Sequence, residues 1–207
     1  MPAELTVTAL RQTSPGRVSV ELSSGDEVKS TLNVVTDLRL FIGKAVDEEL
    51  LGALRAASDE ARTRNRALDL LSRRQMSCRE LYDKLIRKGE DERAAASCVQ
   101  WLLENGLLDD AGYAAAVVRH YAAKGYGAGR IRSELSRRGV DRELWDDALA
   151  QMPEQDEKLM KLIASRLPDP QDRDQVRRVS AALFRRGYSW DEIRSALRRF
   201  EVEAEDE

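Results

Sequence analysis

The residues that could carry out catalysis are few and isolated in this sequence. His120 is its one histidine and lies in a run with helical character. Asp109 and Asp110 have no third carboxylate or histidine at metal-ligand spacing, so they indicate a helix cap and a turn. Cys78 and Cys98 have neither a CxxC pattern nor a histidine partner, which is typical of reduced, metal-free thiols. The sequence therefore predicts a protein that is not an enzyme and uses no metal or cofactor.

Arginine and lysine side chains offer a different chemistry, the binding of phosphate or carboxylate groups. Three segments, residues 76–89, 126–139 and 188–200, share a short polar stretch, two aliphatic residues four apart and a basic cluster. Their alignment makes three basic positions equivalent in the clusters (Arg87, Arg137, Arg199) and three more before the middle helix (Arg74, Lys124, Arg186). The candidate residues for binding a partner or DNA are Arg74, Lys84, Arg87, Lys88, Lys124, Tyr126, Arg130, Arg132, Arg137, Arg138, Arg186, Arg194 and Arg199.

One local rule is broken in the second segment. Residues 77–80 and 189–192 both read Ser-x-x-Glu, a capping box that satisfies free N–H groups at a helix start. Gly127 and Arg130 take these two places in the second segment. Either Arg130 serves binding or the position has drifted on a solvated helix face. If Gly127 can adopt an ordinary cap conformation, restoring the box with Gly127→Ser and Arg130→Glu should stabilise the protein by roughly 0.5–2 kcal/mol.

Helices must position these side chains. The aliphatic pairs Leu81/Leu85 and Ile131/Leu135 each lie on one helical face, because residues four apart are stacked neighbours. Self-similarity of this length indicates small helical units that bury their faces against one another. Trp101 is expected in such a core. We predict a mainly α protein whose tandem three-helix repeats form a curved, elongated array, with helices that end at glycines in the left-handed conformation, at 89, 106 and 139.

The first third of the chain differs from the rest. Residues 5–9, 18–22 and 28–32 alternate apolar and polar side chains, which predicts a small antiparallel sheet covered by a short helix and by a helix after Asp47. Asp59 is the expected cap of the next helix. The predicted domains are an N-terminal β/α unit (1–57), three repeats (58–110, 111–156, 157–200) and an acidic tail (201–207).

Charge is distributed unevenly along the 207 residues. The formal net charge is −3, yet residues 61–200 contain 28 Lys and Arg against 22 Asp and Glu. This excess of positive charge predicts a basic surface for a polyanion or an acidic partner. The N-terminus lacks the basic and apolar regions of a signal peptide, so a cytoplasmic location is expected.

With these residues in view, the sequence resembles the RecX family of RecA recombinase regulators. The similarity extends over nearly the whole chain and is strongest in residues 67–71, 79–89, 106–110 and 124–140, which read ALDLL, RELYDKLIRKG, GLLDD and KGYGAGRIRSELSRRGV. The acidic tail and the Pro-rich loop at 167–171 depart from the family pattern.

The resemblance implies a non-enzymatic protein that binds the RecA filament on single-stranded DNA. Family members mostly block filament extension, the RecA ATPase and strand exchange, in DNA recombination, repair and the SOS response. A monomer that lies along the filament, with its basic repeats in weak direct contact with DNA and no membrane association, is expected. The alternative is a helical-repeat protein that binds nucleic acid independently of RecA.

Overall fold

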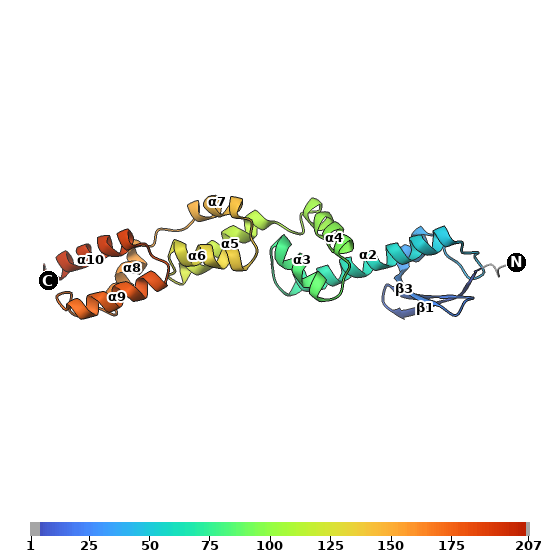
Figure 1. Cartoon of the computed structure of the whole chain (residues 1–207), viewed down its shortest axis with the longest axis horizontal. Helices are drawn as coiled ribbons and strands as arrows, with labels where there is room; N and C mark the ends of the chain where they lie inside the picture. Colours follow the sequence, from blue (N-terminus) through green and yellow to red (C-terminus); the bar gives the residue numbers. More distant parts are fainter. Residues whose placement is uncertain (1–4, 206–207) are drawn as a thin grey trace. The chain divides into compact units, whose positions relative to one another are not determined.

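The computed structural model describes residues 5–205, and helices dominate it (Figure 1). The strands are β1 (Val7–Ser14), β2 (Arg17–Leu22) and β3 (Glu27–Thr31). The helices are α1 (Leu32–Asp37), α2 (Glu48–Arg73), α3 (Cys78–Arg87), α4 (Glu92–Glu104), α5 (Asp110–Ala123), α6 (Ala128–Arg137), the 3-10 turn η1 (Arg142–Leu144), α7 (Trp145–Ala150), α8 (Asp156–Ala164), α9 (Arg173–Arg185) and α10 (Trp190–Glu205). Part of the expected acidic tail belongs to α10, and residues 206–207 lie outside the described residues.

The described chain forms two compact units. One contains the residues up to 75 together with 81–107, and the other contains 76–80 together with the residues from 108 onward. Each unit has its own buried core.

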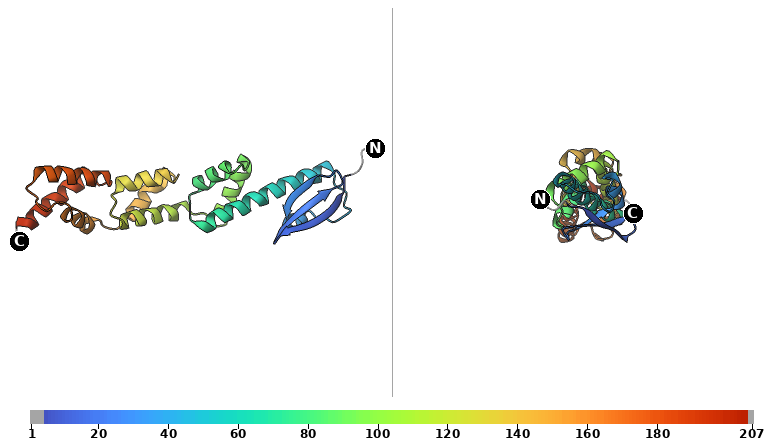
Figure 2. Two further views of the ribbon diagram at one scale, coloured as in Figure 1. Left: turned by 90° about the horizontal axis from the view of Figure 1, so that it is seen from below. Right: turned by 90° about the vertical axis from the view of Figure 1, so that its right-hand side faces the viewer.

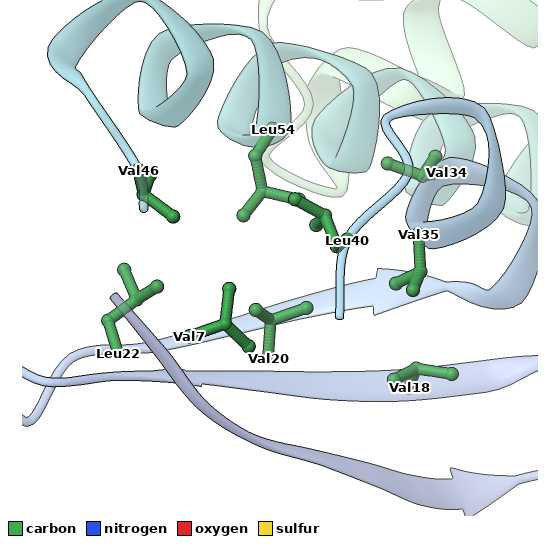
Figure 3. Close-up of a cluster of buried hydrophobic side chains, with 9 residues drawn as sticks. All are labelled: Val7, Val18, Val20, Leu22, Val34, Val35, Leu40, Val46 and Leu54. Atoms are coloured by element: carbon green, nitrogen blue, oxygen red, sulfur yellow. The ribbon is translucent and has the colours of Figure 1, made fainter. Parts of the chain in front are cut away.

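The first unit begins with the predicted antiparallel sheet, whose strand order is β1-β2-β3. Val18, Val20 and Leu22 alternate along β2 and point to one face, where they are buried. Figure 3 shows these side chains facing Leu54 of α2, which is fully buried. The sheet is stabilised by this apolar contact, because three short strands alone have little core to bury.

Helix α2 is continuous from Glu48 to Arg73, so the predicted helix start at Asp59 is wrong. The Asp47 carboxylate caps the helix by accepting from the Leu50 N–H at 2.7 Å, as predicted for a helix after Asp47. Residue 58 lies in the middle of the helix, where its hydroxyl donates to Ser30 of β3 at 2.8 Å and is buried. The same helix therefore covers the sheet with its first half and packs with α3 and α4 through its second half.

A buried carboxylate holds the second half of α2 to the turn between α3 and α4. Glu90 is 5% exposed and accepts a hydrogen bond from the Thr63 hydroxyl at 2.6 Å. The guanidinium of Arg66 also pairs with Glu90, and it donates to the Lys88 carbonyl at 3.0 Å. Polar groups buried this deeply require such partners.

The second unit contains two groups of three helices, α5–α7 and α8–α10 (yellow-green to red in Figure 2). Ile131 and Leu135 of α6 are fully buried against Val118 of α5. In the last group, Leu183 of α9 and Ile193 of α10 form the corresponding core. Each of the first two predicted repeats contains its expected helices, except that the first helix of repeat 1 begins at Glu48, well before residue 58.

The order of helices in the last group corrects one alignment. We aligned residues 188–200 with the middle helices α3 and α6, but α10 is preceded by both α8 and α9 and is therefore the third helix. The middle helix is α9, because it ends at Gly187 in the left-handed region (φ 92°), as α3 ends at Gly89 (φ 83°) and α6 at Gly139 (φ 67°). The left-handed conformations predicted at Gly89, Gly106 and Gly139 are confirmed.

Candidate protein and nucleic-acid interface

Three of the candidate arginines converge on one buried carboxylate of α6. The Glu134 side chain is 5% exposed, and its Oε2 lies 2.5 Å from Arg137 Nη2. Arg130 Nη2 lies 3.2 Å from Oε1, and Arg138 Nε lies 3.8 Å from Oε2. Three guanidinium groups thus surround one carboxylate, which leaves the cluster positive overall. Because Glu134 fixes them, these arginines are oriented before any ligand arrives.

The ionisation of Glu134 depends on these neighbours. Burial alone would raise the pKa of its carboxyl group, but hydrogen bonds from Arg137 and Tyr121, and the charges of Arg137 and Arg130, hold it below its ordinary value of 4.5. The cluster is therefore fully charged at neutral pH.

The less exposed members of the candidate set have structural contacts. Arg138 Nη1 donates to the Tyr113 hydroxyl at 2.8 Å. Its guanidinium lies 5.9 Å from the ring centroid of Tyr121, and that ring lies 5.7 Å from Tyr126. Lys124 Nζ also lies over Tyr121, at 6.0 Å. Alternating cations and aromatic rings of this kind stabilise one another.

Arg186 continues this arrangement from α9 and joins the two helical groups of the second unit. Its guanidinium lies 5.3 Å from the Tyr126 ring, and its Nη1 is 3.3 Å from the Gly125 carbonyl. The same carbonyl accepts a hydrogen bond from the buried Tyr188 hydroxyl at 3.2 Å. Tyr126 and Arg186 therefore hold neighbouring helical groups together, in addition to any binding role.

The backbone at the start of α6 explains the missing capping box. Gly127 N–H donates to the Arg186 carbonyl at 3.0 Å, and Gly129 N–H donates to the Gly187 carbonyl at 2.9 Å. A Cβ at Gly127 would lie 2.4 Å from the Gly187 oxygen, a contact that real side chains do not make. Glycine is thus required here by a close backbone approach. The prediction that Gly127→Ser stabilises the protein is therefore wrong, because the serine side chain would collide with the Gly187 backbone.

The box at residues 189–192 forms in both directions, and the serine half of the box at residues 77–80 also forms. Ser189 accepts from the Glu192 N–H at 3.2 Å, and the Glu192 carboxylate accepts from the Ser189 N–H at 2.6 Å. Ser77 accepts from the Glu80 N–H at 3.1 Å. The Ser77 hydroxyl also donates to the Arg138 carbonyl at 2.5 Å. A residue at the start of one middle helix thus contacts the end of the next, as Gly127 does with Arg186.

The remaining candidates lie on exposed or half-exposed surfaces. Arg132 Nη2 is 3.9 Å from Asp146, Arg199 Nη1 is 2.8 Å from Asp156, and Arg194 pairs with Asp191. Ion pairs this exposed contribute little to stability and leave the cations available to a partner. The other members are distributed over repeat 1: Arg74, Lys84, Arg87 and Lys88.

The corrected alignment identifies a residue that sequence reasoning missed. Each of the three left-handed glycines that end a middle helix follows two basic residues, and the third pair is Arg185 and Arg186. Arg185 is thus the counterpart of Arg87 and Arg137, a position that we had assigned to Arg199. The signal was present in the sequence as a basic-basic-glycine triplet.

The described residues also bear on two other kinds of function, metal binding and membrane insertion. No cluster of three or more His, Cys, Asp or Glu side chains there could hold a metal ion. None of the described helices has the length and apolar character needed to cross a membrane.

Comparison with known proteins gives a consistent result. Models of the first, second and third three-helix domains of RecX match residues 64–102, 109–149 and 154–197. The regulatory protein RecX of Xanthomonas axonopodis pv. citri is 41% identical over 141 residues, 67% of this chain and 86% of that protein. The RecX protein of Vibrio parahaemolyticus is 36% identical over 134 residues, 63% of this chain and 86% of that protein.

Solved structures agree with this. A crystal structure of a regulatory protein RecX superposes with a TM-score of 0.76 at 26% identity and covers 96% of this chain and 99% of its own. RecX from Lactobacillus salivarius has a TM-score of 0.63 at 25% identity and covers 70% and 99%. The predicted class of tandem three-helix domains after a small sheet is confirmed.

Proposed function

Because the chain belongs to the RecX family of regulatory proteins, we propose that it regulates the RecA recombinase by binding the RecA filament on single-stranded DNA. The observation that carries this proposal is the presence of all three RecX three-helix domains in order. In this proposal the protein acts by binding alone, as a monomer in the cytoplasm, and it inhibits filament extension, ATP hydrolysis and strand exchange.

A series of similar domains suits a repetitive partner. Each domain binds weakly through a few charged contacts, and linkage of the domains makes the second and third contacts intramolecular. The protomers of a filament offer such contacts at regular intervals, whereas a small substrate does not. A protein bound across several protomers resists the addition of further subunits, which accounts for inhibition of extension.

Exposed arginines of the middle helices are the best candidates for these contacts. Arg132 and Arg137 of α6 and Arg185 of α9 are exposed, and the first two have only surface or cluster ion pairs. Their guanidinium groups fit the carboxylates of a protein partner or the phosphates of DNA. Tyr126, Arg138 and Arg186 are assigned mainly to the structure of the second unit.

A RecA assay with matched variants tests the proposal. The wild-type protein should associate with RecA on single-stranded DNA in a pull-down and lower the RecA ATPase. The variant Arg132→Ala/Arg137→Ala should weaken both effects about 10-fold or more. The control is Arg11→Ala in the N-terminal sheet, where a 71% exposed side chain loses one positive charge, to be compared with each single variant, Arg132→Ala and Arg137→Ala. Unchanged ATPase with tight binding to naked DNA would contradict the proposal.

That outcome would favour the second candidate function, a nucleic-acid-binding protein that does not need RecA. Its basis is the positive charge of residues 61–200. Direct DNA binding falls steeply with salt because counterions are released. A titration with salt in the absence of RecA therefore separates the two functions.

A further inference from the structure

Two aromatic side chains of the last helical group are exposed and stacked on each other. Phe184 of α9 and Trp190 of α10 are each 50% exposed. Their ring centroids are 4.9 Å apart with an interplanar angle of 18°. Single exposed apolar side chains are common on protein surfaces, but two stacked rings form a short aromatic stack, which a further flat ring can extend on an outer face. Neither ring is needed to fill the core, where Leu183 and Ile193 are already fully buried.

Phe184, one ring of the pair, borders a hollow with a volume of about 440 Å³ in the second unit. One wall is the start of α6, residues 128–133, and the other is the turn between α9 and α10 with Phe184 and Glu192. The volume lies within the range of about 300–1,000 Å³ that is typical of ligand sites. Because Gly127 and Gly129 have no side chains, the backbone at the start of α6 can lie close to the turn after α9, and the two walls of the hollow meet there.

The hollow is positively charged. Arg130, Arg132 and Arg185 line it, against one carboxylate, Glu192. The Glu192 carboxylate accepts the Ser189 N–H in the capping box and is thereby engaged. Among the side chains of residues 5–202, Arg185 has no ion-pair or side-chain hydrogen-bond partner, and Arg132 has only the exposed Asp146 at 3.9 Å.

An aromatic stack beside exposed arginines with few acidic partners matches the chemistry of single-stranded nucleic acid. Unpaired bases stack on aromatic rings while basic side chains follow the phosphates. In a duplex the base faces are covered by their neighbours, so a stacking surface of this kind selects single strands. We propose that Phe184 and Trp190 form a stacking platform for an unpaired base of single-stranded DNA, with Arg185 and Arg132 holding the adjacent phosphates. This inference rests on the proposed function, because the single-stranded DNA would be the strand that carries the RecA filament.

The test uses the full chain and a fluorescent oligothymidine of about 20 nucleotides in low salt, without RecA. The variants Phe184→Ala and Trp190→Ala should each weaken binding roughly 5- to 150-fold, as loss of one stacked base does. Trp190→Phe keeps an aromatic ring and should retain most of the affinity. Arg185→Ala should weaken binding and lower the salt slope by about 0.7, the value for one phosphate contact to a single strand.

Matched controls separate these effects from general ones. Phe41 is 61% exposed in the N-terminal unit, and Phe41→Ala should leave the affinity unchanged. Arg173→Ala removes the same charge at the opposite end of α9 and should change the affinity less than Arg185→Ala. Circular dichroism melts confirm that each variant is folded. Duplex DNA should bind more weakly than the single strand, and with the same affinity to wild type and Trp190→Ala.

Three results would overturn the platform. The first is a wild-type protein that does not bind the oligonucleotide, and the second is equal binding by wild type and both aromatic variants. The third is loss of RecA inhibition in Trp190→Ala with unchanged oligonucleotide binding, which would make the pair a docking surface for protein. None of these refutes RecA regulation, because that is measured separately by ATPase.

Discussion

Substitution of serine for Gly127 tests how the two helical groups of the second unit are joined. By local criteria the change should stabilise the protein, since Gly127 has φ −76° and ψ 168°, an ordinary N-cap conformation. A serine there would gain a cap hydrogen bond of about 1 kcal/mol. The opposing effect arises from residues about sixty positions away in the sequence.

The added Cβ would lie 2.4 Å from the Gly187 oxygen and 2.6 Å from the Tyr188 nitrogen, both of which are backbone atoms. The two segments must then separate by about 1 Å to restore normal contact. Separation breaks the hydrogen bonds of Gly127 N–H and Gly129 N–H, which contribute about 1 kcal/mol each. Overpacking costs about 1–3 kcal/mol more. The net expectation is a loss of about 2–4 kcal/mol in the free energy of unfolding, even after the gain from the cap.

Urea denaturation followed by circular dichroism measures this change. The control is Gly52→Ala in α2, where an added Cβ has no neighbour within 4 Å. That variant should gain about 0.5–1 kcal/mol from helix propensity. An increase in stability of Gly127→Ser, comparable to that of Gly52→Ala, would refute the close approach of α6 to Gly187. Adding Arg130→Glu should lower stability further, since it places a second carboxylate one turn from Glu134.

Other expected outcomes concern the charged cluster, the thiols and the N-terminal unit. Glu134→Gln should cost about 1–3 kcal/mol in urea denaturation, because three arginines lose their shared partner, whereas the exposed Glu143→Gln should cost under about 0.5 kcal/mol. The pKa of Glu134 is lower in the folded than in the unfolded state, so the ionised carboxylate stabilises the fold above pH 4.5, and this contribution is lost as the pH falls below that value. In Glu134→Gln the free energy of unfolding should therefore decrease less between pH 5 and acid pH than in the wild type. Burial raises the pKa of Cys98 to about 11 and, with the nearby Asp110 carboxylate, that of Cys78 to about 12, so Ellman's reagent at pH 8 should react slowly until urea unfolds the chain; fast native labelling would contradict this. A chain of residues 58–207 begins inside α2 and lacks residues 48–57 of that helix together with the Asp47 cap, so it should keep the helical circular dichroism of the repeats but lose at least the ~1 kcal/mol of the cap, and aggregation would show that the sheet completes the helical core.

Features set by short sequence separations were predictable. Alternating residues such as Val18 and Val20 indicated strands, and pairs such as Leu81 and Leu85 indicated helices, because these periods follow from backbone geometry. The capping boxes and the left-handed glycines could likewise be predicted, because each depends only on residues within about one helical turn.

Features that depend on distant contacts were missed. Asp59 fits a helix cap locally, yet Leu54 and Ser58 pack on the sheet and keep α2 continuous through it. In the sequence, Gly127 resembled a position that had lost its helix-capping residue. Only the folded structure shows that the backbone of Gly187 lies too close to Gly127 for a side chain to fit. The candidate site was partly predictable for the same reason: the sequence indicated that the arginines lie on helices but could not show that Glu134 gathers three of them.

In each basic-basic-glycine triplet, the carbonyl oxygen of the second basic residue accepts a hydrogen bond from a group outside its own helix. The last carbonyls of a helix lack partners within it and need donors from elsewhere. The Arg186 carbonyl accepts from Gly127 N–H, and the Arg138 carbonyl accepts from the Ser77 hydroxyl, so each is satisfied by the preceding group. The equivalent Lys88 carbonyl has no preceding group and accepts instead from Arg66 of α2. The second half of the long helix α2, which belongs to the first repeat, therefore supplies the donor that caps the end of α3.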